Sequence, residues 1–274
     1  PMQGKIWRAV GFETQRGCPY TCTFCNSPSN NVEYKAETGG KFHRKKSIGR
    51  MKKELDFLVK KYDPNLIYFV VDTFLAMSNR EFDELKELYS DYKIPFWMNT
   101  RAETINEYRA AGLAEMNMLR MNIGIEHGNY EYRRNYLKRN VKNEVQIRAF
   151  QIAAEHDYAS CANSIIGMPD ETRDLIFDTI NFVRELPDSI DATGAFIFAP
   201  YHGTPLRDLA ISKGYIDEEE ICSLSNTSES MLRMPTISKN EIQGLAKTFS
   251  LYTKFPKDRW PEIKIAESDG AEGT

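Results

Sequence analysis

Three of the five cysteines fall within eight residues, in the spacing Cys18-x3-Cys22-x2-Cys25. Thiolates bind iron and zinc, and a 4Fe–4S cluster normally takes four of them. Because only three are local, one iron would stay open to a ligand from outside the protein. An open coordination position distinguishes a reactive metal site from a closed structural one. The spacing therefore predicts Cys18, Cys22 and Cys25 as ligands of a 4Fe–4S cluster.

Zinc is the main alternative at this loop. A structural zinc site would need a fourth ligand from His43, Cys161 or His127, and none of these has a recognisable spacing. Zinc fingers favour paired ligands on two separated arms. A disulfide framework does not suit a chain of 274 residues with five cysteines. A non-catalytic zinc or iron–sulfur module stays open on these residues alone.

The wider motif resembles the signature of the radical S-adenosylmethionine (SAM) superfamily, with Phe24 directly before the last cysteine. The preceding residues 13–19 (Glu-Thr-Gln-Arg-Gly-Cys-Pro) and the later Gly203-Thr204-Pro205 resemble the catalytic core of its cobalamin-dependent branch. The resemblance implies two cofactors, a 4Fe–4S cluster and SAM bound to the open iron. It also implies the chemistry, in which one electron cleaves SAM to give a 5′-deoxyadenosyl radical.

The same resemblance implies a reaction class and partners. Members of that branch transfer methyl groups to unactivated positions, and an electron donor such as flavodoxin or ferredoxin reduces the cluster. Cobalamin would come through an N-terminal domain for which these residues have no room. That domain would precede Pro1 if the chain is an excised core, and cobalamin is doubtful if the chain is the whole protein. A methylthiotransferase-like enzyme is the related alternative, although its extra cluster cysteines and basic RNA-binding domain are absent from the sequence. The substrate is not indicated.

Six further residues are predicted to contact SAM. By resemblance, Phe24 lies near the adenine. Asp72, or Thr73 beside it, stands where many members carry a Gly-Gly-Glu motif for the SAM amino group. Without a SAM contact, Phe24 could simply pack within its loop and Asp72 could simply end a strand, and these alternatives are equally consistent with the sequence. The predicted SAM contacts are Phe24, Asp72, Glu126, Arg139, Gly167 and Pro169.

The other four follow two later strands. Gly124-Ile125-Glu126-His127-Gly128 resembles a Gly-x-Glu-Ser-Gly segment, and a carboxylate such as Glu126 can accept from ribose hydroxyls or an ammonium group. Arg139 has the planar fork that fits the SAM carboxylate. Residues 167–172 resemble a Gly-x-Pro-Gly-Glu-Thr segment, in which Gly167 and Pro169 would approach the adenine and Asp170 replaces a glycine. His127 could titrate, and ion pairs or surface positions explain these residues in other proteins.

Composition excludes several classes of protein. Charged residues make up 27% and hydrophobic residues 41%, as in an ordinary globular chain. The net charge of −3 makes nucleic-acid binding unlikely, although residues 41–53 hold seven Lys/Arg before the first acid. No run of eighteen apolar residues predicts a membrane span. Cysteines without a secretion signal favour a reducing compartment, the cytoplasm.

Hydrophobic periodicity supplies the elements that position these residues. Apolar runs predict strands at 7–14, 66–71, 94–98, 118–125, 160–166 and 192–199. Helices follow at 48–59, after Asn79, through Ala111 to a stop near Gly112, at about 130–156 with a break near Asn140, and at 171–186 and 205–213. A polar loop is expected after the cysteines, as far as Gly39-Gly40. Repeated βα units predict a parallel α/β sheet, and the resemblance favours a partial (β/α)6 barrel over a doubly wound sheet.

The alternation predicts where the chain divides. We expect residues 1–214 to form the barrel core and residues 215–274 a C-terminal extension, mostly helical with a frayed tail. Residues 238–252 predict one amphipathic helix in this extension, with Ile242, Leu245 and Phe249 on one face. Catalytic groups of such a core belong at the carboxyl ends of its strands. The cysteine loop follows the first predicted strand, and Asp72, Glu126 and Gly167 lie at or just after the ends of later ones.

Overall fold

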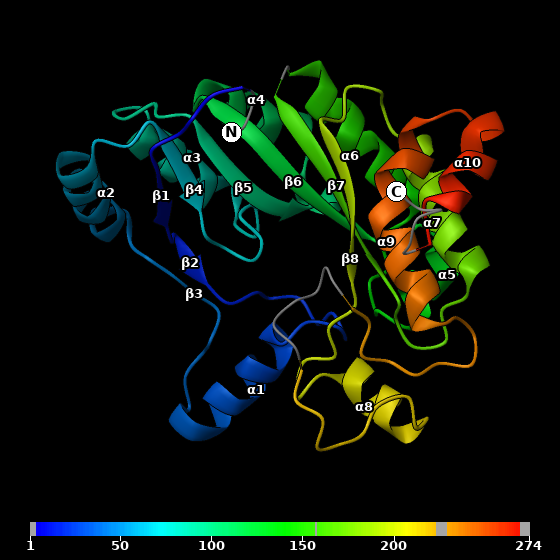
Figure 1. Ribbon diagram of the computed structural model, residues 1–274. Coiled ribbons are helices and arrows are strands. Elements are labelled where there is room, and N and C mark those ends of the chain that lie inside the picture. The colour runs from blue at the N-terminus through cyan, green and yellow to red at the C-terminus, as the bar shows by residue number, and fades with distance from the viewer. Residues whose placement is uncertain (1–3, 157, 223–228, 269–274) are drawn as a thin grey trace. The chain divides into compact units, whose positions relative to one another are not determined.

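The computed structural model describes residues 4–156, 158–222 and 229–268. Six strands form the main sheet, and two short antiparallel strands form a second, two-stranded sheet (Figure 1). The strands are β1 (Ala9–Phe12), β2 (Gln15–Arg16), β3 (Arg44–Lys45), β4 (Leu66–Phe69), β5 (Phe96–Arg101), β6 (Met118–Glu126), β7 (Ala159–Ile166) and β8 (Ala192–Ile197). All six predicted strands are confirmed, with ends that differ from the prediction by a few residues.

The order of strands in the main sheet is β1-β4-β5-β6-β7-β8. The pairs β1–β4, β4–β5 and β5–β6 are parallel. Each strand neighbours the next main-sheet strand along the chain, so the order never reverses. A doubly wound sheet requires such a reversal, which is where its ligands bind. The observed order is that of a partial (β/α)6 barrel, and it confirms the predicted fold class.

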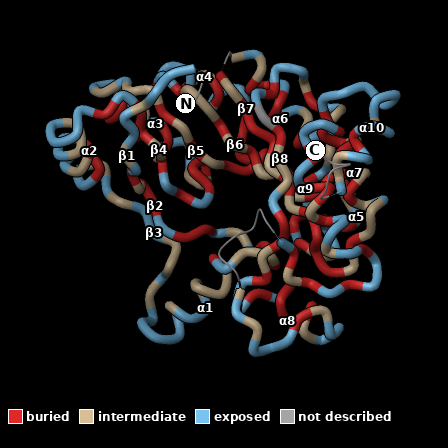
Figure 2. Tube along the Cα trace, in the orientation of Figure 1, coloured by how far each residue is buried: buried red, intermediate tan, exposed pale blue. Residues whose placement is uncertain are grey.

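The strands alternate between two kinds of surroundings. On β5, Phe96 and Met98 are fully buried, whereas Trp97 and Asn99 are half-buried. Residues of a strand point alternately to its two faces, so one face of β5 carries apolar side chains and the other polar or aromatic ones. Figure 2 shows buried residues recurring along β4, β5 and β6. This alternation gives the sheet one apolar face for its helices.

The helices begin and end where capping residues place them. The helix α2 starts after Ser47, whose side chain accepts from the Arg50 N–H, as predicted. The helix α3 starts after Ser78, which forms a capping box with Glu81. The α-helices are α1 (Ser27–Thr38), α2 (Ile48–Tyr62), α3 (Asn79–Tyr89), α4 (Glu107–Glu115), α5 (Tyr130–Asn135), α6 (Asn143–Glu155), α7 (Arg173–Arg184), α8 (Pro205–Ser212), α9 (Lys239–Lys254) and α10 (Trp260–Ile265). Two 3-10 turns lie at Ala102–Thr104 and Lys257–Arg259.

Two local predictions were wrong. The stretch after the cysteines is a helix, α1, and not a polar loop that runs to Gly39. Its only buried side chain is that of Ser27, so it has no apolar stripe for periodicity to detect. The helix α4 runs past Gly112 to Glu115. Gly112 serves close packing instead, because a Cβ there would lie 2.6 Å from the Phe82 ring.

Contacts divide the chain into two compact units. Unit 1 comprises residues 1–19, 30–124 and 148–161, and unit 2 comprises residues 20–29, 125–147 and 162–274. Within unit 2, α9 packs on β8 and α7, and α10 packs on α9 (Figure 1). The boundary expected at residue 214 is not tested by this division and stays a prediction. Within the described ranges, no helix combines the length and the apolar character needed to cross a bilayer.

Candidate functional site

The first cysteine of the loop lies in unit 1. Cys18 is 8% exposed, and its Sγ lies 3.5 Å from the Thr73 hydroxyl oxygen. Its carbonyl oxygen accepts from the Asn31 side-chain amide at 3.0 Å. Gly17 has φ +76°, and a Cβ there would lie 2.6 Å from a ring carbon of Phe42. The glycine before the cysteine is therefore required by both its backbone conformation and its close packing.

The other two cysteines lie in unit 2. Cys22 is buried, whereas Cys25 and Phe24 are half-buried. Thr23, between them, holds this part of the loop through three hydrogen bonds. Its N–H donates to the Leu137 carbonyl at 3.3 Å, its hydroxyl donates to the Tyr136 carbonyl at 2.5 Å, and its carbonyl accepts from the Leu206 N–H at 3.2 Å. Thr23 thus anchors this part of the loop through its backbone and its hydroxyl.

The donor set fits an iron–sulfur cluster. All five cysteines are described, and none forms a disulfide. The Ser27 N–H donates to the Cys25 Sγ at 3.4 Å, and Thr73 offers a hydroxyl to Cys18. Hydrogen bonds to ligand sulfurs are typical of cluster sites, whose potential they adjust. Across the described ranges no three Cys, His, Asp or Glu side chains form a ready metal cage. The cluster assignment therefore depends on three thiols within eight residues of chain.

Two predicted SAM contacts bind each other. Glu126 ends β6 and has φ +64°, a left-handed conformation that is costly for a side chain other than asparagine, aspartate or glycine. Its carboxylate accepts from the Arg139 Nη1 at 2.6 Å, and the two side chains are 13% and 2% exposed. The ion pair expected as the alternative role of Glu126 is present, and its partner is Arg139. Strained residues persist where surrounding contacts over-determine them, often at functional sites.

His127 is a buried structural residue. It is 0% exposed, and its Nδ1 accepts from the Asn129 N–H at 3.0 Å. Because Nδ1 uses its lone pair there, the proton lies on Nε2, which donates to Glu171 at 3.0 Å. A surface position, the ordinary alternative for His127, is wrong because the side chain is fully buried.

The segment after β7 is organised by Glu171, a residue that sequence reasoning did not single out. Its second carboxylate oxygen accepts from the N–H groups of Gly167 (2.5 Å) and Met168 (3.0 Å). Gly167 has φ +78°, and a Cβ there would lie 2.9 Å from Ile242. Pro169 is buried, and its carbonyl accepts from the Tyr132 hydroxyl at 2.6 Å. The sequence signal for this role was the position of Glu171, four residues after Gly167, where its carboxylate can accept from the backbone of the turn.

Asp170 takes the left-handed conformation that glycine would adopt, with φ +62°. Its carboxylate accepts from Lys213 at 2.6 Å, Tyr215 at 2.7 Å and Tyr136 at 3.0 Å. In unit 1, Asp72 is exposed after β4, whereas its neighbour Thr73 is buried. Of these two predicted acceptors, the Thr73 hydroxyl contacts the Cys18 sulfur, and only the Asp72 side chain is exposed to solvent.

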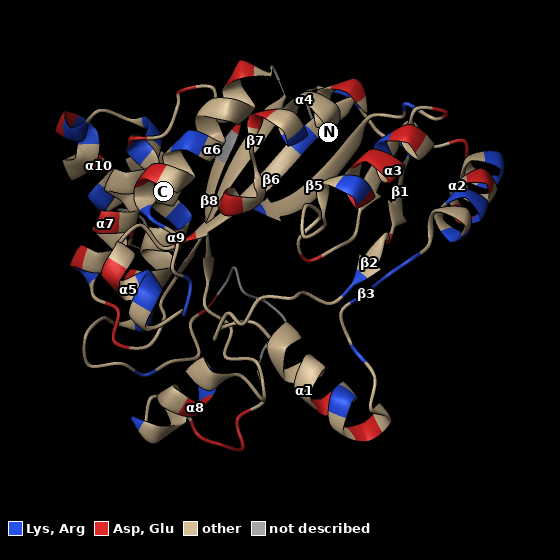
Figure 3. Cartoon of the chain, turned by 180° about the vertical axis from the view of Figure 1, so that it is seen from behind, with Lys and Arg blue, Asp and Glu red and all other residues tan. Residues whose placement is uncertain are grey.

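The basic run at residues 41–53 is largely neutralised by acids. Lys45 pairs with Glu81 at 2.8 Å, and Lys46 and Arg50 both pair with Glu54 at 2.7 Å and 2.5 Å. Lys52 pairs with Asp56. Figure 3 shows Lys/Arg and Asp/Glu mixed along α2. Four of the seven basic residues therefore have acidic partners, two at or beside β3 and two on α2.

Comparisons with known proteins identify the family and the fold. The family model of the radical SAM superfamily matches residues 12–183. An uncharacterized methyltransferase, PH0819, of Pyrococcus horikoshii is 30% identical over 204 residues, which are 74% of this chain and 42% of the relative. The cobalamin-dependent SAM radical enzyme OxsB, solved with aqua-cobalamin and SAM, superposes with a TM-score of 0.62 at 16% identity, over 97% of this chain and 44% of that one.

A second solved structure gives the same fold. The radical SAM methyltransferase TsrM of Kitasatospora setae, with cobalamin and a 4Fe–4S cluster bound, superposes with a TM-score of 0.57 at 16% identity. The match covers 75% of this chain and 37% of that one. The chain thus spans less than half the length of the relatives that it resembles. Residues 12–183, which the family model matches, include all three loop cysteines and both strand-end segments.

Proposed function

Because the chain belongs to the radical SAM superfamily, we propose that it is the radical-generating core of a methyltransferase that acts on an unactivated position of its substrate. The observation that carries the proposal is the Cys18-x3-Cys22-x2-Cys25 loop inside the region that the family model matches. When bound, the cluster and SAM supply a 5′-deoxyadenosyl radical. The chain's own residues bind, orient and shield these groups.

The cysteines have the clearest role in this proposal. Cys18, Cys22 and Cys25 would hold three irons, and the Thr73 hydroxyl and the Ser27 N–H would donate to two of their sulfurs. These hydrogen bonds stabilise negative charge on sulfur, so they favour the reduced cluster. A flavodoxin or ferredoxin would supply the electron, and a reducing compartment such as the cytoplasm suits a reduced cluster.

The SAM contacts follow from the same segments. Asp72, exposed after β4, would accept from the SAM ammonium group. Glu126 would accept from the ribose hydroxyls with its second oxygen, while Arg139 holds the first. The pair limits Arg139 as a carboxylate ligand, because its Nη1 already donates to Glu126. Phe24, Gly167 and Pro169 would border the adenine.

Methyl transfer is supported by one relative and cobalamin by the solved neighbours. The 30%-identical relative is described as a methyltransferase, and both neighbouring structures contain cobalamin. The cobalamin-binding domain would lie outside residues 1–274. We propose no residue of this chain as a cobalamin ligand.

Anaerobic SAM cleavage tests the proposal. The protein is reconstituted with iron and sulfide and reduced with dithionite, SAM is added, and 5′-deoxyadenosine is measured. Cys22→Ala should abolish the product, whereas Cys222→Ala, outside the loop, should retain it. Tightly bound zinc with no iron would show that the loop is a closed structural site. A full cluster without 5′-deoxyadenosine would contradict radical generation by this core.

A further inference from the structure

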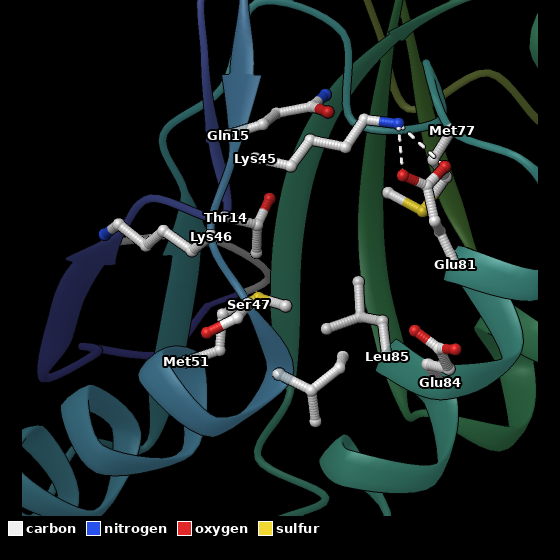
Figure 4. A pocket seen from close by; sticks show the side chains of 11 residues that line it. Thr14, Gln15, Lys45, Lys46, Ser47, Met51, Met77, Glu81, Glu84 and Leu85 are labelled. Carbon is white, nitrogen blue, oxygen red and sulfur yellow. Dashed lines mark hydrogen bonds and ion pairs between the residues drawn. The ribbon is translucent and has the colours of Figure 1, made fainter.

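A pocket of about 230 Å³, partly open to solvent, lies in unit 1 beside the start of the cysteine loop. The two-stranded sheet β2–β3 contributes one wall, and the first turns of α2 and α3 contribute the others. Figure 4 shows Thr14 and Gln15 on the strand side and Glu81, Glu84 and Leu85 on the side of α3. Its lining residues are Thr14, Gln15, Lys45, Lys46, Ser47, Ile48, Met51, Met77, Glu81, Glu84 and Leu85.

Two buried oxygens line this pocket without a hydrogen-bond partner. They are the Thr14 Oγ1 and the Gln15 Oε1, on side chains only 4% and 2% exposed. The orientation of the Gln15 amide is fixed, because its Nε2 donates at 2.5 Å to the Thr73 carbonyl, which can only accept. A buried polar atom without a partner is costly, and native structures normally satisfy it. Both oxygens can accept a hydrogen bond from a bound molecule.

The charges of the wall are paired within the protein. Lys45 reaches across to Glu81 at 2.8 Å, as the dashed lines of Figure 4 show. Lys46 pairs with Glu54 at 2.7 Å, and Glu84 accepts from Arg80 at 2.9 Å. Burying an ion against these pairs would cost its hydration without a free counter-charge. The wall therefore favours a neutral ligand over an ionic one.

The remaining surface is apolar and adaptable. Ile48 and Leu85 supply branched aliphatic surface, and Met51 and Met77 supply flexible thioethers. Methionine packs well against flat rings and adjusts to irregular shapes. The volume of about 230 Å³ lies below the usual range of about 300–1,000 Å³ for drug-sized ligands, so only a small molecule fits. A ligand here would combine an apolar body with one or two polar groups.

We propose that this pocket binds a small neutral molecule with an apolar body and a hydrogen-bond donor, an alcohol or a primary amide. The donor would satisfy the Gln15 Oε1 or the Thr14 Oγ1, and the body would pack on the two methionines and Leu85. Neither the radical chemistry nor the SAM contacts use this pocket, so it is a separate binding site.

The site is linked to the cluster loop by hydrogen bonds within unit 1. Gln15 donates to the Thr73 carbonyl at 2.5 Å, and the Thr73 hydroxyl lies 3.5 Å from the Cys18 Sγ. A ligand that engages Gln15 therefore acts two contacts from a predicted cluster sulfur. Hydrogen bonds at such sulfurs set the reduction potential of a cluster. The pocket would thus regulate cluster reduction, a part of the inference that rests on the proposed function.

Binding is tested by calorimetry on the full chain without its cluster. The probes are 2-phenylethanol and hexanamide. The control compounds are ethylbenzene, which lacks the hydrogen-bond donor, and 3-phenylpropionate, which carries a negative charge. We expect the two probes to bind about tenfold more tightly than either control compound, because one good hydrogen bond changes the dissociation constant by about that factor. Gln15→Met should remove this preference and Met77→Trp should block the pocket. Gln151→Met, at an exposed glutamine on α6, should bind like the parent.

Each other result overturns a stated part of the inference. Failure of both donors to bind, or equal binding of ethylbenzene, refutes the proposed ligand class. Binding that survives both Gln15→Met and Met77→Trp places the ligand elsewhere. The amide resonances of Thr73 and Cys18 should shift when 2-phenylethanol binds, and unchanged resonances refute the link to the loop. Because no cluster is needed, these outcomes are independent of the 5′-deoxyadenosine assay.

Discussion

Replacing Asp170 by glycine should destabilise the protein, although glycine is the residue that its backbone favours. Asp170 has φ +62°, and relief of this conformation by glycine would gain about 0.5–1 kcal/mol. The change also removes contacts to Lys213, Tyr215 and Tyr136 at 2.6, 2.7 and 3.0 Å. The two effects oppose each other, so their magnitudes decide the sign.

The lost contacts should outweigh the relieved backbone. A hydrogen bond to a charged group contributes about 1.5–3 kcal/mol when buried, and less when water competes. The Asp170 side chain is 19% exposed, so we take about 1–1.5 kcal/mol for each of its three contacts. The sum of about 3–4 kcal/mol less the relief leaves a net loss of about 2–3 kcal/mol. Asp170→Ala should lose about 1 kcal/mol more, since alanine tolerates this conformation poorly.

The charge makes this contribution depend on pH. Burial raises the pKa of Asp170, but hydrogen bonds from Lys213, Tyr215 and Tyr136 outweigh it and hold the pKa below the ordinary 3.8. A depressed carboxyl pKa stabilises the fold above the unfolded-state value, and this stabilisation is lost as pH falls through the folded-state value. Asp170→Asn, which tolerates the same backbone, should therefore be destabilised at pH 7 and should approach the parent as the pH falls below 3.8.

Urea unfolding followed by circular dichroism measures these differences. Asp188→Asn, at an exposed aspartate of the same unit, serves as the control and should behave like the parent. If Asp170→Gly equals or exceeds the parent in stability, the reasoning from the three contacts is wrong. A loss for Asp170→Asn that is the same at both extremes of pH would assign the effect to shape and not to charge.

Two further predictions concern buried and ion-paired acids. His127→Ala should cost about 3 kcal/mol in urea unfolding, because it leaves a cavity and removes one partner of the fully buried Glu171 carboxylate; a loss below about 1 kcal/mol would show that water replaces the ring. Burial raises the pKa of Glu81, but hydrogen bonds from Lys45 and Ser78 lower it to about 2. Glu81→Gln should therefore lower the thermal midpoint at pH 7. At pH 2 it should leave the midpoint nearly unchanged, because the stabilisation from this depressed pKa is lost as the pH falls from 4.5 to about 2. An equal shift at both pH values would contradict that linkage.

The sequence by itself determined the strands and the cluster loop, because both are encoded locally. Strand periodicity is complete within a few residues, and the three cysteines fall within eight. Given the strands, the order of the sheet followed from their succession along the chain and from the family resemblance. The helix α1 was missed since it buries only Ser27 and has no apolar stripe to reveal it.

Only the tertiary structure decided what the polar side chains of the site contact. Glu126 and Arg139 are 13 residues apart and Gln15 and Thr73 are 58 apart, and no local pattern links such positions. The resemblance placed a glycine at Asp170, but only the structure shows the three partners of its carboxylate, Lys213, Tyr215 and Tyr136. Residue types show which groups can accept or donate, whereas folding decides which of them meet. Glu126 and Arg139 bind each other inside the fold, and a glutamate and an arginine that bind a ligand would have the same residue types.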